Sequence, residues 1–399
     1  MLPPLIHRCS RLLLGGLCLA VLGCGAANEE TMSATLTPKT PEKSPAAGAQ
    51  SMLSVQREPY GTLENGQTVE QYTLTNSHGT QVDVITWGGI ITQVKTPDQA
   101  GQFANIVLGF DSLDDYLVNK PYLGGICGRF ANRIRNAEFT LDDKTYQLAK
   151  NSGQHHIHGG VTSFIKKLWA GEPVQEPDAV GVKLRYISAD GEEGYPGTLT
   201  NIVTYRLNEN NELRIDYEVT TDKPTVLNIT NHSYWNLSGK PGSTILDHEL
   251  VIPADSYVAI DEDAIPTGEL TPVDGTCMDF RQPHTIGERI TETVNGHGGY
   301  DHCYVINGKA GDLRPTAKVV HPATGRVMEV STTEPGVQLY TGNYLEGTPE
   351  TAGAPKQGAF CLEAQHLPDS PNQPKFPTTR LNPGETYRQT TVHRFSVLP

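Results

Sequence analysis

Apolar and polar residues alternate strictly over residues 213–219, which read Leu-Arg-Ile-Asp-Tyr-Glu-Val. Successive side chains of a β-strand point to opposite faces of a sheet, so this period of two predicts a strand with one buried apolar face. Residues 203–207 alternate in the same way, and the sequence Asn-Glu-Asn-Asn at 208–211 favours a turn between the two segments. The pattern therefore predicts a β-hairpin.

Short segments of the same kind recur along the chain, at residues 67–75, 81–87, 317–320, 326–330 and 337–340. We find no long amphipathic helix pattern, no repeat of fixed period and no linker within residues 55–399. The 399 residues include 40 Gly and 28 Pro, and both residue types interrupt helices. These features predict one large all-β domain over residues 55–399, with antiparallel sheets that pack face to face or close into a barrel.

The first residues have the pattern of an export signal. A region that contains Arg8 and Arg11 precedes an apolar run over residues 12–22. This run is too short to span the roughly 30 Å of a bilayer core, and it is typical of a cleaved signal peptide. Residues 21–24 (Val-Leu-Gly-Cys) resemble a bacterial lipobox, in which cleavage leaves a lipid-bearing Cys24 at the new N-terminus. The alternative is an ordinary signal peptide in which this cysteine is incidental.

We therefore expect a lipoprotein signal peptide over residues 1–23, a flexible linker over 24–54 and the folded domain over 55–399. Residues 28–54 are rich in Ser, Thr, Pro, Ala and Glu, and they hold too few large apolar residues to offset the entropy lost on ordering. The protein is expected to be exported and anchored by lipid to a membrane, on the periplasmic or cell-surface side.

Charge and cysteine usage exclude several classes of protein. The formal charge is -14, whereas a nucleic-acid partner normally requires a basic surface. With one short apolar run, the chain is not a multi-pass membrane protein. Beyond Cys24, four cysteines remain at irregular spacing, with no CxxC pair that would indicate zinc and no evident disulfide framework. We expect these cysteines to be small buried apolar residues, and the sequence indicates no obligate protein partner.

Several segments differ from plain strands because they combine His, Asn, Arg or carboxylates with Gly and aromatic residues. They lie at residues 128–134, 155–160, 190–197, 231–236, 300–302, 336–340 and 361–365.

Most of these segments have an ordinary structural interpretation. Arg129 is expected to be exposed or ion-paired, His232 to be a hydrogen-bonded core residue and Asp301 to serve a turn. Residues 190–197 (Asp-Gly-Glu-Glu-Gly-Tyr-Pro-Gly) are most simply a tight acidic turn, and we assign them no chemistry. Glu363 is harder to explain in this way, since it follows apolar residues on a strand predicted to be buried, where a carboxylate must be paired or hydrogen-bonded.

Metal and cofactor chemistry find little support. The three histidines at 155, 156 and 158 have no carboxylate or cysteine near them at a familiar ligand spacing, so we predict no metal site. The chain lacks a G-x-S-x-G elbow, a glycine-rich phosphate loop and a nucleotide fingerprint, so we predict no cofactor. What remains is an acid–base site of His and Glu among amide, hydroxyl and aromatic groups, which suits a sugar.

Across residues 57–398 the chain resembles the aldose 1-epimerase (galactose mutarotase) family. The most specific motifs are Gly-Arg-Phe-Ala-Asn-Arg-Ile at 128–134, His-Gly-Gly at 158–160, Asp-Gly-Glu-Glu-Gly-Tyr-Pro-Gly at 190–197, Thr-Asn-His-Ser-Tyr-Trp-Asn-Leu at 230–237, and Cys-Leu-Glu-Ala-Gln-His at 361–366 with Pro-Asp-Ser-Pro-Asn-Gln-Pro at 368–374. The chain departs from the family at 163–166, where Ser-Phe-Ile-Lys replaces the usual continuation of His-Gly-Gly.

This resemblance implies a large antiparallel β-sandwich, often called a supersandwich, that interconverts the anomers of free hexoses such as glucose and galactose without a cofactor. It also implies roles for the matching positions. Glu363 is the expected base and His232 the expected acid, and the expected substrate contacts are Asn132, Arg133, His158, Tyr234, Asp301 and Gln338.

Three other functions remain open at this stage. A hexose-6-phosphate epimerase would use the same chemistry but needs basic residues at the far end of the pocket, and this acidic chain has no obvious basic cluster. A non-catalytic carbohydrate-binding β-sandwich would need the aromatic and amide groups without the acid and base. A glycoside hydrolase would use Asp301 and Glu363 as paired carboxylates.

Overall fold

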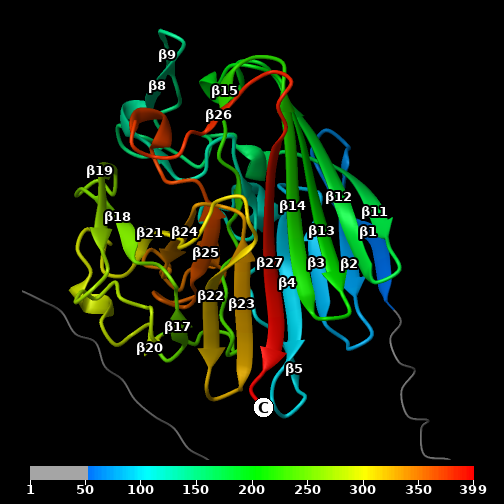
Figure 1. Ribbon diagram of the computed structural model, residues 1–399. Helices are drawn as coiled ribbons and strands as arrows, with labels where there is room; N and C mark the ends of the chain where they lie inside the picture. The colour runs from blue at the N-terminus through cyan, green and yellow to red at the C-terminus, as the bar shows by residue number, and fades with distance from the viewer. Residues whose placement is uncertain (1–52) are drawn as a thin grey trace, which may run out of the picture. The chain divides into compact units, whose positions relative to one another are not determined.

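The computed structural model describes residues 53–399 (Figure 1). The predicted signal peptide, Cys24 and nearly all of the predicted linker lie outside the described residues, so these parts and the domain boundaries stay predictions. No helix in the described part of the chain is long and apolar enough to cross a membrane.

The predicted hairpin forms two neighbouring strands, β13 (Leu199–Asn208) and β14 (Glu212–Thr221), of a nine-stranded antiparallel sheet (Figure 1). In order across the sheet, its strands are β11 (Ala170–Gln175), β12 (Ala179–Ser188), β13, β14, β27 (Tyr387–Val397), β23 (Arg326–Thr332), β22 (Arg314–His321), β17 (Glu249–Val251) and β20 (His284–Thr285). The alternating residues Leu213, Ile215, Tyr217 and Val219 of β14 are all buried, as the period of two predicts.

A second sheet packs on this one from the N-terminal part of the chain. Its strands, in spatial order, are β1 (Ser54–Thr62), β2 (Thr68–Thr75), β3 (Gln81–Ile85), β4 (Ile90–Pro97) and β5 (Phe103–Asn105). Tyr72 and Val84 from this sheet share one hydrophobic core with Val182 and Tyr205 from the nine-stranded sheet. The two sheets therefore form a sandwich rather than a barrel, which confirms the all-β fold class.

A third sheet extends the same core and carries much of the candidate site. It is ordered β19 (Pro266–Pro272), β18 (Ser256–Ile260), β21 (Asp301–Val305), β24 (Gly336–Tyr340) and β25 (Cys361–Gln365). All five residues of β24 and all five of β25 are buried.

Four short ribbons of two strands complete the sheet structure. They pair β6 (Ile126–Cys127) with β16 (Thr230–Asn231), β7 (Arg133–Ile134) with β10 (His156–Ile157), β8 (Glu138–Leu141) with β9 (Lys144–Gln147), and β15 (Thr225–Val226) with β26 (Arg380–Leu381). Within residues 53–399 the one α-helix is the six-residue α1 (Leu113–Val118). Six 3₁₀ turns lie at Arg135–Ala137, Phe164–Lys166, Glu192–Gly194, Ile290–Glu292, Pro349–Thr351 and Ser370–Asn372.

The sequence-based strands are close to those observed. The segment predicted at 81–87 is shorter in the structure, because the chain turns at Gly88 and Gly89, which both have positive φ. A Cβ atom at Gly88 would lie 2.3 Å from the carbonyl oxygen of Ile165, so the close approach of that loop requires a glycine here. Four cysteines were predicted to be buried. Three of them, Cys127, Cys303 and Cys361, are buried, and Cys277 is partly exposed.

Candidate active site

Glu363 lies in the middle of β25, with 2% of its surface exposed. It pairs across the sheet with Gln338 of β24, and Cys361 lies two residues before it on the same face of the strand. The Oε2 atom of Glu363 is buried and has no hydrogen-bond partner among the described residues. A buried carboxylate oxygen without a partner is costly, so this atom is poised to accept a bond from a ligand.

The imidazole of His232 faces this carboxylate. His232 follows β16, and backbone hydrogen bonds hold it against the loop before β6: its N–H donates to the Gly125 carbonyl (2.8 Å) and its carbonyl accepts from Gly124 N–H (2.9 Å). Its Nε2 atom lies 3.5 Å from Oε1 of Glu363. The ring stacks on Tyr234, with ring centres 5.1 Å apart, so the nitrogen that faces Glu363 is held at a fixed position.

The β7–β10 ribbon brings Asn132, Arg133 and His158 together. His158 N–H donates to the Asn132 carbonyl (3.1 Å), and Asn132 N–H donates in return to Nδ1 of His158 (3.3 Å). A neutral imidazole that accepts at Nδ1 carries its proton on Nε2, so His158 presents an N–H donor from that nitrogen. Asn132 and His158 both have positive φ (63° and 48°), a strained conformation that is frequent at functional sites.

Asp301 begins β21, next to β24 in the same sheet as Glu363. Its Oδ1 accepts a hydrogen bond from Nε2 of Gln338 (2.7 Å), and its Oδ2 lies 3.6 Å from Nη2 of Arg133. The carboxylate is thus held between an amide and a guanidinium, one on the sheet and one on the β7–β10 ribbon.

These side chains surround one cavity of about 180 Å³. It is lined by Lys120, Pro121, Tyr122, Asn132, Arg133, Ile157, His158, His232, Tyr234, Asp301, Tyr340, Tyr344, Leu345 and Glu363. Drug-sized ligands occupy pockets of roughly 300–1,000 Å³, so this one suits a smaller molecule. Seven of the eight predicted site residues line the cavity. Gln338 does not, and it contacts the site through Asp301.

Sequence reasoning missed part of the wall, most clearly Lys120, Tyr122 and Tyr344. The ring of Tyr122 lies 4.7 Å from that of His158, and Tyr344 is 54% exposed at the cavity. The loops that carry these residues place asparagine and tyrosine near glycine at 119–125 and 342–344, but they add no histidine, arginine or carboxylate, so their signal is weaker than that of the other segments. Tyr122 has a φ of 62°, a strained conformation that local sequence does not reveal.

Burial shifts the ionisation of the three central groups. It raises the pKa of Glu363 well above its usual value, and the nearby Asp301 charge adds to this effect while Arg133 opposes it. Burial also lowers the pKa of His232 to about 4. The pKa of His158 is lowered well below its usual value by burial and by the neighbouring His232 and Arg133. The pKa of the carboxyl group is thus above that of the imidazole, the reverse of their usual order, and such shifts are typical of an acid–base pair.

Two groups of side chains bring potential metal-ligand atoms together. The ligand atoms of His158, His232 and Glu363 lie within 4.8 Å of one another, as do those of Asp247, His248 and His321. In the first group Asn132 N–H occupies Nδ1 of His158, and in the second Leu237 N–H donates to Nε2 of His248 (3.0 Å). The other nitrogen of each of these two rings therefore carries a proton. Hydrogen bonding is favoured over metal binding at both groups.

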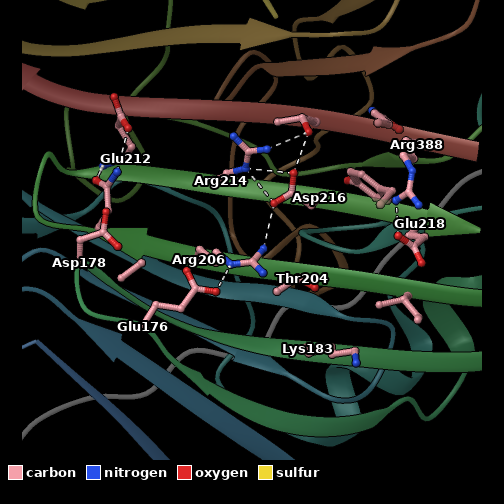
Figure 2. A pocket seen from close by; sticks show the side chains of 16 residues that line it. Glu176, Asp178, Lys183, Thr204, Arg206, Glu212, Arg214, Asp216, Glu218 and Arg388 are labelled. Carbon is pink, nitrogen blue, oxygen red and sulfur yellow. Dashed lines mark hydrogen bonds and ion pairs between the residues drawn. The ribbon is translucent and has the colours of Figure 1, made fainter. Parts of the chain in front are cut away.

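A larger hollow of about 750 Å³ lies on the outer face of the nine-stranded sheet (Figure 2). Its charged side chains pair with one another: Arg206 bonds Glu176 (3.0 Å) and Asp216 (2.9 Å), and Arg214 bonds Asp216 (2.8 Å). No histidine lines it. This hollow has neither a buried carboxylate oxygen without a partner nor an imidazole, and the small cavity has both. The small cavity is therefore the candidate active site.

Comparison with known proteins finds relatives along most of the chain. The family model for aldose 1-epimerase matches residues 70–394. Galactose mutarotase from Bos taurus is 46% identical over 351 residues, covering 87% of this chain and all of the relative, and the Homo sapiens protein of that name is 45% identical over the same length. Aldose 1-epimerase from Escherichia coli is 37% identical, over 83% of this chain and 96% of the relative.

Solved structures show the same fold. The crystal structure of galactose 1-epimerase from Lactobacillus acidophilus aligns with a TM-score of 0.77 and 28% identity, over 87% of this chain and 99% of that one. An aldose epimerase homologue from C. elegans aligns with a TM-score of 0.73 and 29% identity, over 81% and 97% of the two chains.

Proposed function

This chain belongs to the aldose 1-epimerase family and interconverts the α and β anomers of an aldose, and we propose that Glu363 and His232 perform the two proton transfers of this reaction. The observation that carries the proposal is the 3.5 Å separation of His232 Nε2 and Glu363 Oε1 at one small cavity.

The chemistry needs only an acid and a base. The C1 atom of a cyclic aldose is a hemiacetal carbon, and its two configurations exchange when the ring opens, the C1–C2 bond turns and the ring closes again. Opening requires the loss of a proton from the C1 hydroxyl and the gain of a proton by the ring oxygen, and no C–H bond breaks. Each positioned proton transfer contributes about 10²–10⁴ in rate.

Glu363 takes the proton of the C1 hydroxyl on its unpartnered Oε2, and His232 gives a proton from Nε2 to the ring oxygen. The C1–O5 bond breaks as the C1 carbonyl forms. On closure, His232 takes the proton from the C5 hydroxyl as its oxygen attacks C1, and Glu363 returns a proton to the C1 oxygen. The enzyme therefore ends each turnover in its starting protonation state.

The ionisation of the two side chains fits this scheme. The raised pKa of Glu363 and the lowered pKa of His232 place one shared proton on the carboxyl group. The reactive form has the same number of protons and the same net charge, with that proton on His232. It is reached by an internal transfer between two atoms that are already 3.5 Å apart.

The remaining predicted contacts hold the sugar. His158 Nε2–H, Asn132 and the Asp301 carboxylate provide donors and acceptors for hydroxyl groups, and Tyr234 supplies an aromatic face. Arg133 stabilises the negative charge that develops on the sugar oxygens during the proton transfers. Gln338 acts through Asp301, whose carboxylate it orients.

We propose galactose and glucose as substrates, in line with the names of the mammalian relatives for galactose. A neutral sugar fits the charge at the cavity better than a sugar phosphate. The two cationic residues that line it are both near carboxylates: Lys120 Nζ lies 2.7 Å from Glu350, and Arg133 lies 3.6 Å from Asp301.

The test is the decay of optical rotation of fresh α-galactose and α-glucose, with protein that lacks residues 1–24. We expect wild-type protein to accelerate the decay, and Glu363→Gln to abolish that acceleration while its circular dichroism spectrum is unchanged. Near-normal activity of Glu363→Gln would remove Glu363 from the role of base.

We also propose that the protein is exported and anchored through lipid on Cys24. The support is the sequence of residues 1–24 alone. In the native host, mass spectrometry of the mature N-terminus should find acylated Cys24, and Cys24→Ala should release the protein from the membrane fraction. An unmodified N-terminus at another residue would contradict the anchor.

A further inference from the structure

Glu193, in the loop 190–197, binds the segment that follows His158. Its Oε2 accepts from Val161 N–H (3.1 Å), and its Oε1 accepts from Thr162 N–H (2.8 Å) and from the Thr162 hydroxyl (2.6 Å). A Cβ atom at Gly160 would lie 2.1 Å from Oε2 of Glu193, so the carboxylate occupies space that only a glycine leaves open. Glu193 therefore fixes the chain on the C-terminal side of His158.

The same loop binds the segment that precedes His158. The hydroxyl of Tyr195 lies 2.7 Å from Nε2 of His156, and Nδ1 of His156 lies 2.8 Å from the Ala149 carbonyl. A carbonyl accepts only, so Nδ1 carries the proton of the neutral imidazole and Tyr195 donates to Nε2. Tyr195 and His156 are both fully buried. This bond fixes the chain on the N-terminal side of His158.

Arg129 ties the loop back to the rest of the site. Its guanidinium donates to the carbonyls of Ser188 (3.0 Å), Ala189 (2.6 Å), Pro196 (3.0 Å) and Gly197 (2.8 Å), at both ends of the loop. Arg129 is buried, which corrects the expectation that it is exposed or ion-paired. It belongs to the segment 128–134 that also carries two substrate contacts, so three separate motifs of the sequence form one connected unit.

The segment that this unit holds is strained. His158, Gly159 and Gly160 have successive positive φ values of 48°, 82° and 107°. For a non-glycine residue such as His158 this conformation persists only where neighbouring contacts enforce it. The contacts with Glu193 and Tyr195 flank the strained residues on both sides, and neither residue lines the cavity.

We propose that Glu193 and Tyr195 are positioning residues, which act on the reaction by holding His158 at the sugar. The proposal rests on the proposed function, in which His158 donates to the bound aldose. A displacement of about 1 Å at a substrate contact can cost about 10² in rate, so loss of a clamp outside the cavity changes catalysis without removing any group that touches the sugar.

Glu209 offers a matched control. Its Oε2 accepts from the N–H (3.1 Å) and the hydroxyl (2.6 Å) of Ser77, so it is a carboxylate clamp of the same kind on a loop that does not line the cavity. We expect Glu193→Ala to lower kcat/KM for galactose about tenfold and Tyr195→Phe to lower it severalfold. We expect Glu209→Ala to change the melting temperature as much as Glu193→Ala does and to leave kcat/KM unchanged.

A double-mutant cycle then tests whether the effect passes through His158. If it does, Glu193→Ala should change kcat/KM by less than about twofold when it is added to His158→Gln, because coupled residues are not additive. An undiminished tenfold loss in that background overturns the proposal, as does normal kcat/KM of Glu193→Ala and Tyr195→Phe.

His158→Gln by itself separates this inference from the proposed function. A large loss for His158→Gln with no loss for the clamp variants refutes the positioning role alone. No loss for His158→Gln refutes its role as a substrate contact, and the positioning role falls with it.

Discussion

The imidazole of His232 meets the carboxyl of Glu363 at 3.5 Å, and this contact joins the end of a two-stranded ribbon to a strand of a five-stranded sheet. Both side chains are at least 95% buried, so neither is solvated by bulk water. Each group is therefore held in its uncharged form by burial, and the pair becomes ionised only by passing its proton from the carboxyl to the imidazole.

Substitution of Glu363 by Gln should stabilise the fold. Since the pKa of Glu363 is raised in the folded state, the unfolded chain ionises first as the pH rises above about 4.3, and the folded state is destabilised from there up to the folded pKa. Gln removes this effect. We expect the melting temperature at pH 8 to rise by about 2–4 °C or more, and the gain to shrink toward pH 4.5. Thermal scans of both proteins at the two pH values check this, and an equal difference at both would contradict it.

Substitution of His232 by Asn should lower kcat by about 10²–10⁴, because the acid is lost while the hydrogen-bonding capacity of the side chain is largely kept. KM should change much less. Polarimetry over a range of sugar concentrations separates the two constants. If KM alone rises, His232 binds the sugar and is not the acid.

The dependence of kcat/KM on pH should be broad. In the active form, Glu363 and His232 share one exchangeable proton. Activity therefore falls at low pH, where the pair takes up a second proton on His232, near the His232 pKa of about 4. It falls at high pH as Glu363 loses the shared proton, well above the usual carboxyl range. A pH series of initial rates tests this. An acid limb near 6.5, the value of an ordinary imidazole, would show that burial does not shift His232.

Acid should unfold the protein between pH 6.5 and 4. Four histidines have their pKa lowered to about 4, with burial as the largest cause: His156, His232, His248 and His393. In this window the unfolded chain binds protons that the folded chain does not, so the free energy of unfolding falls as the pH falls. Glu363 has the opposite effect, because in this pH range the folded chain keeps one proton on it that the unfolded chain releases.

The pKa values of His158, His302 and His321 are lowered as well, so the net uptake on unfolding is at least about four protons, which corresponds to roughly 5 kcal/mol per pH unit. Urea titrations at pH 7, 6 and 5 measure the slope. A free energy of unfolding that stays constant over this range would mean that these imidazoles are charged in the folded state.

Tyr344 should affect sugar affinity more than turnover. Its ring is half exposed at the cavity and stacks on Tyr340, with ring centres 6.3 Å apart. Tyr344→Ala removes an aromatic face from the wall but leaves the acid and the base in place, so we expect KM to rise severalfold with kcat within about twofold. A fall in kcat alone would place Tyr344 in the reaction itself.

The strands were predictable because their signal is local. The alternation at 213–219 shows which side chains of β14 face the core, and the same rule located β2, β22, β23 and β24. The sequence also marked the segments that form the cavity, since His, Arg and carboxylates beside Gly are unusual in plain strands. The roles of Glu363, His232 and the substrate contacts rest on the family resemblance and stay predictions, to be tested by the variants above.

Other features depend on contacts between distant parts of the chain, which no local pattern reports. Arg129 was expected to be exposed or ion-paired, yet it is buried because carbonyls some 60 residues away accept its hydrogen bonds. Gln338 stays a predicted substrate contact, and the hydrogen bond from its amide to Asp301 follows from the pairing of β21 with β24, which no local pattern reports. Tyr122 was missed, because its position beside His158 follows from a loop conformation with positive φ.

The base is built into the fully buried strand β25, whereas Lys120, Tyr122 and Tyr344 project from connecting loops. Strand pairing constrains the position of Glu363 tightly, whereas loops tolerate substitutions and insertions far better. Reprogramming this catalyst toward another monosaccharide is therefore a matter of grafting new loops around an unchanged proton-transfer centre.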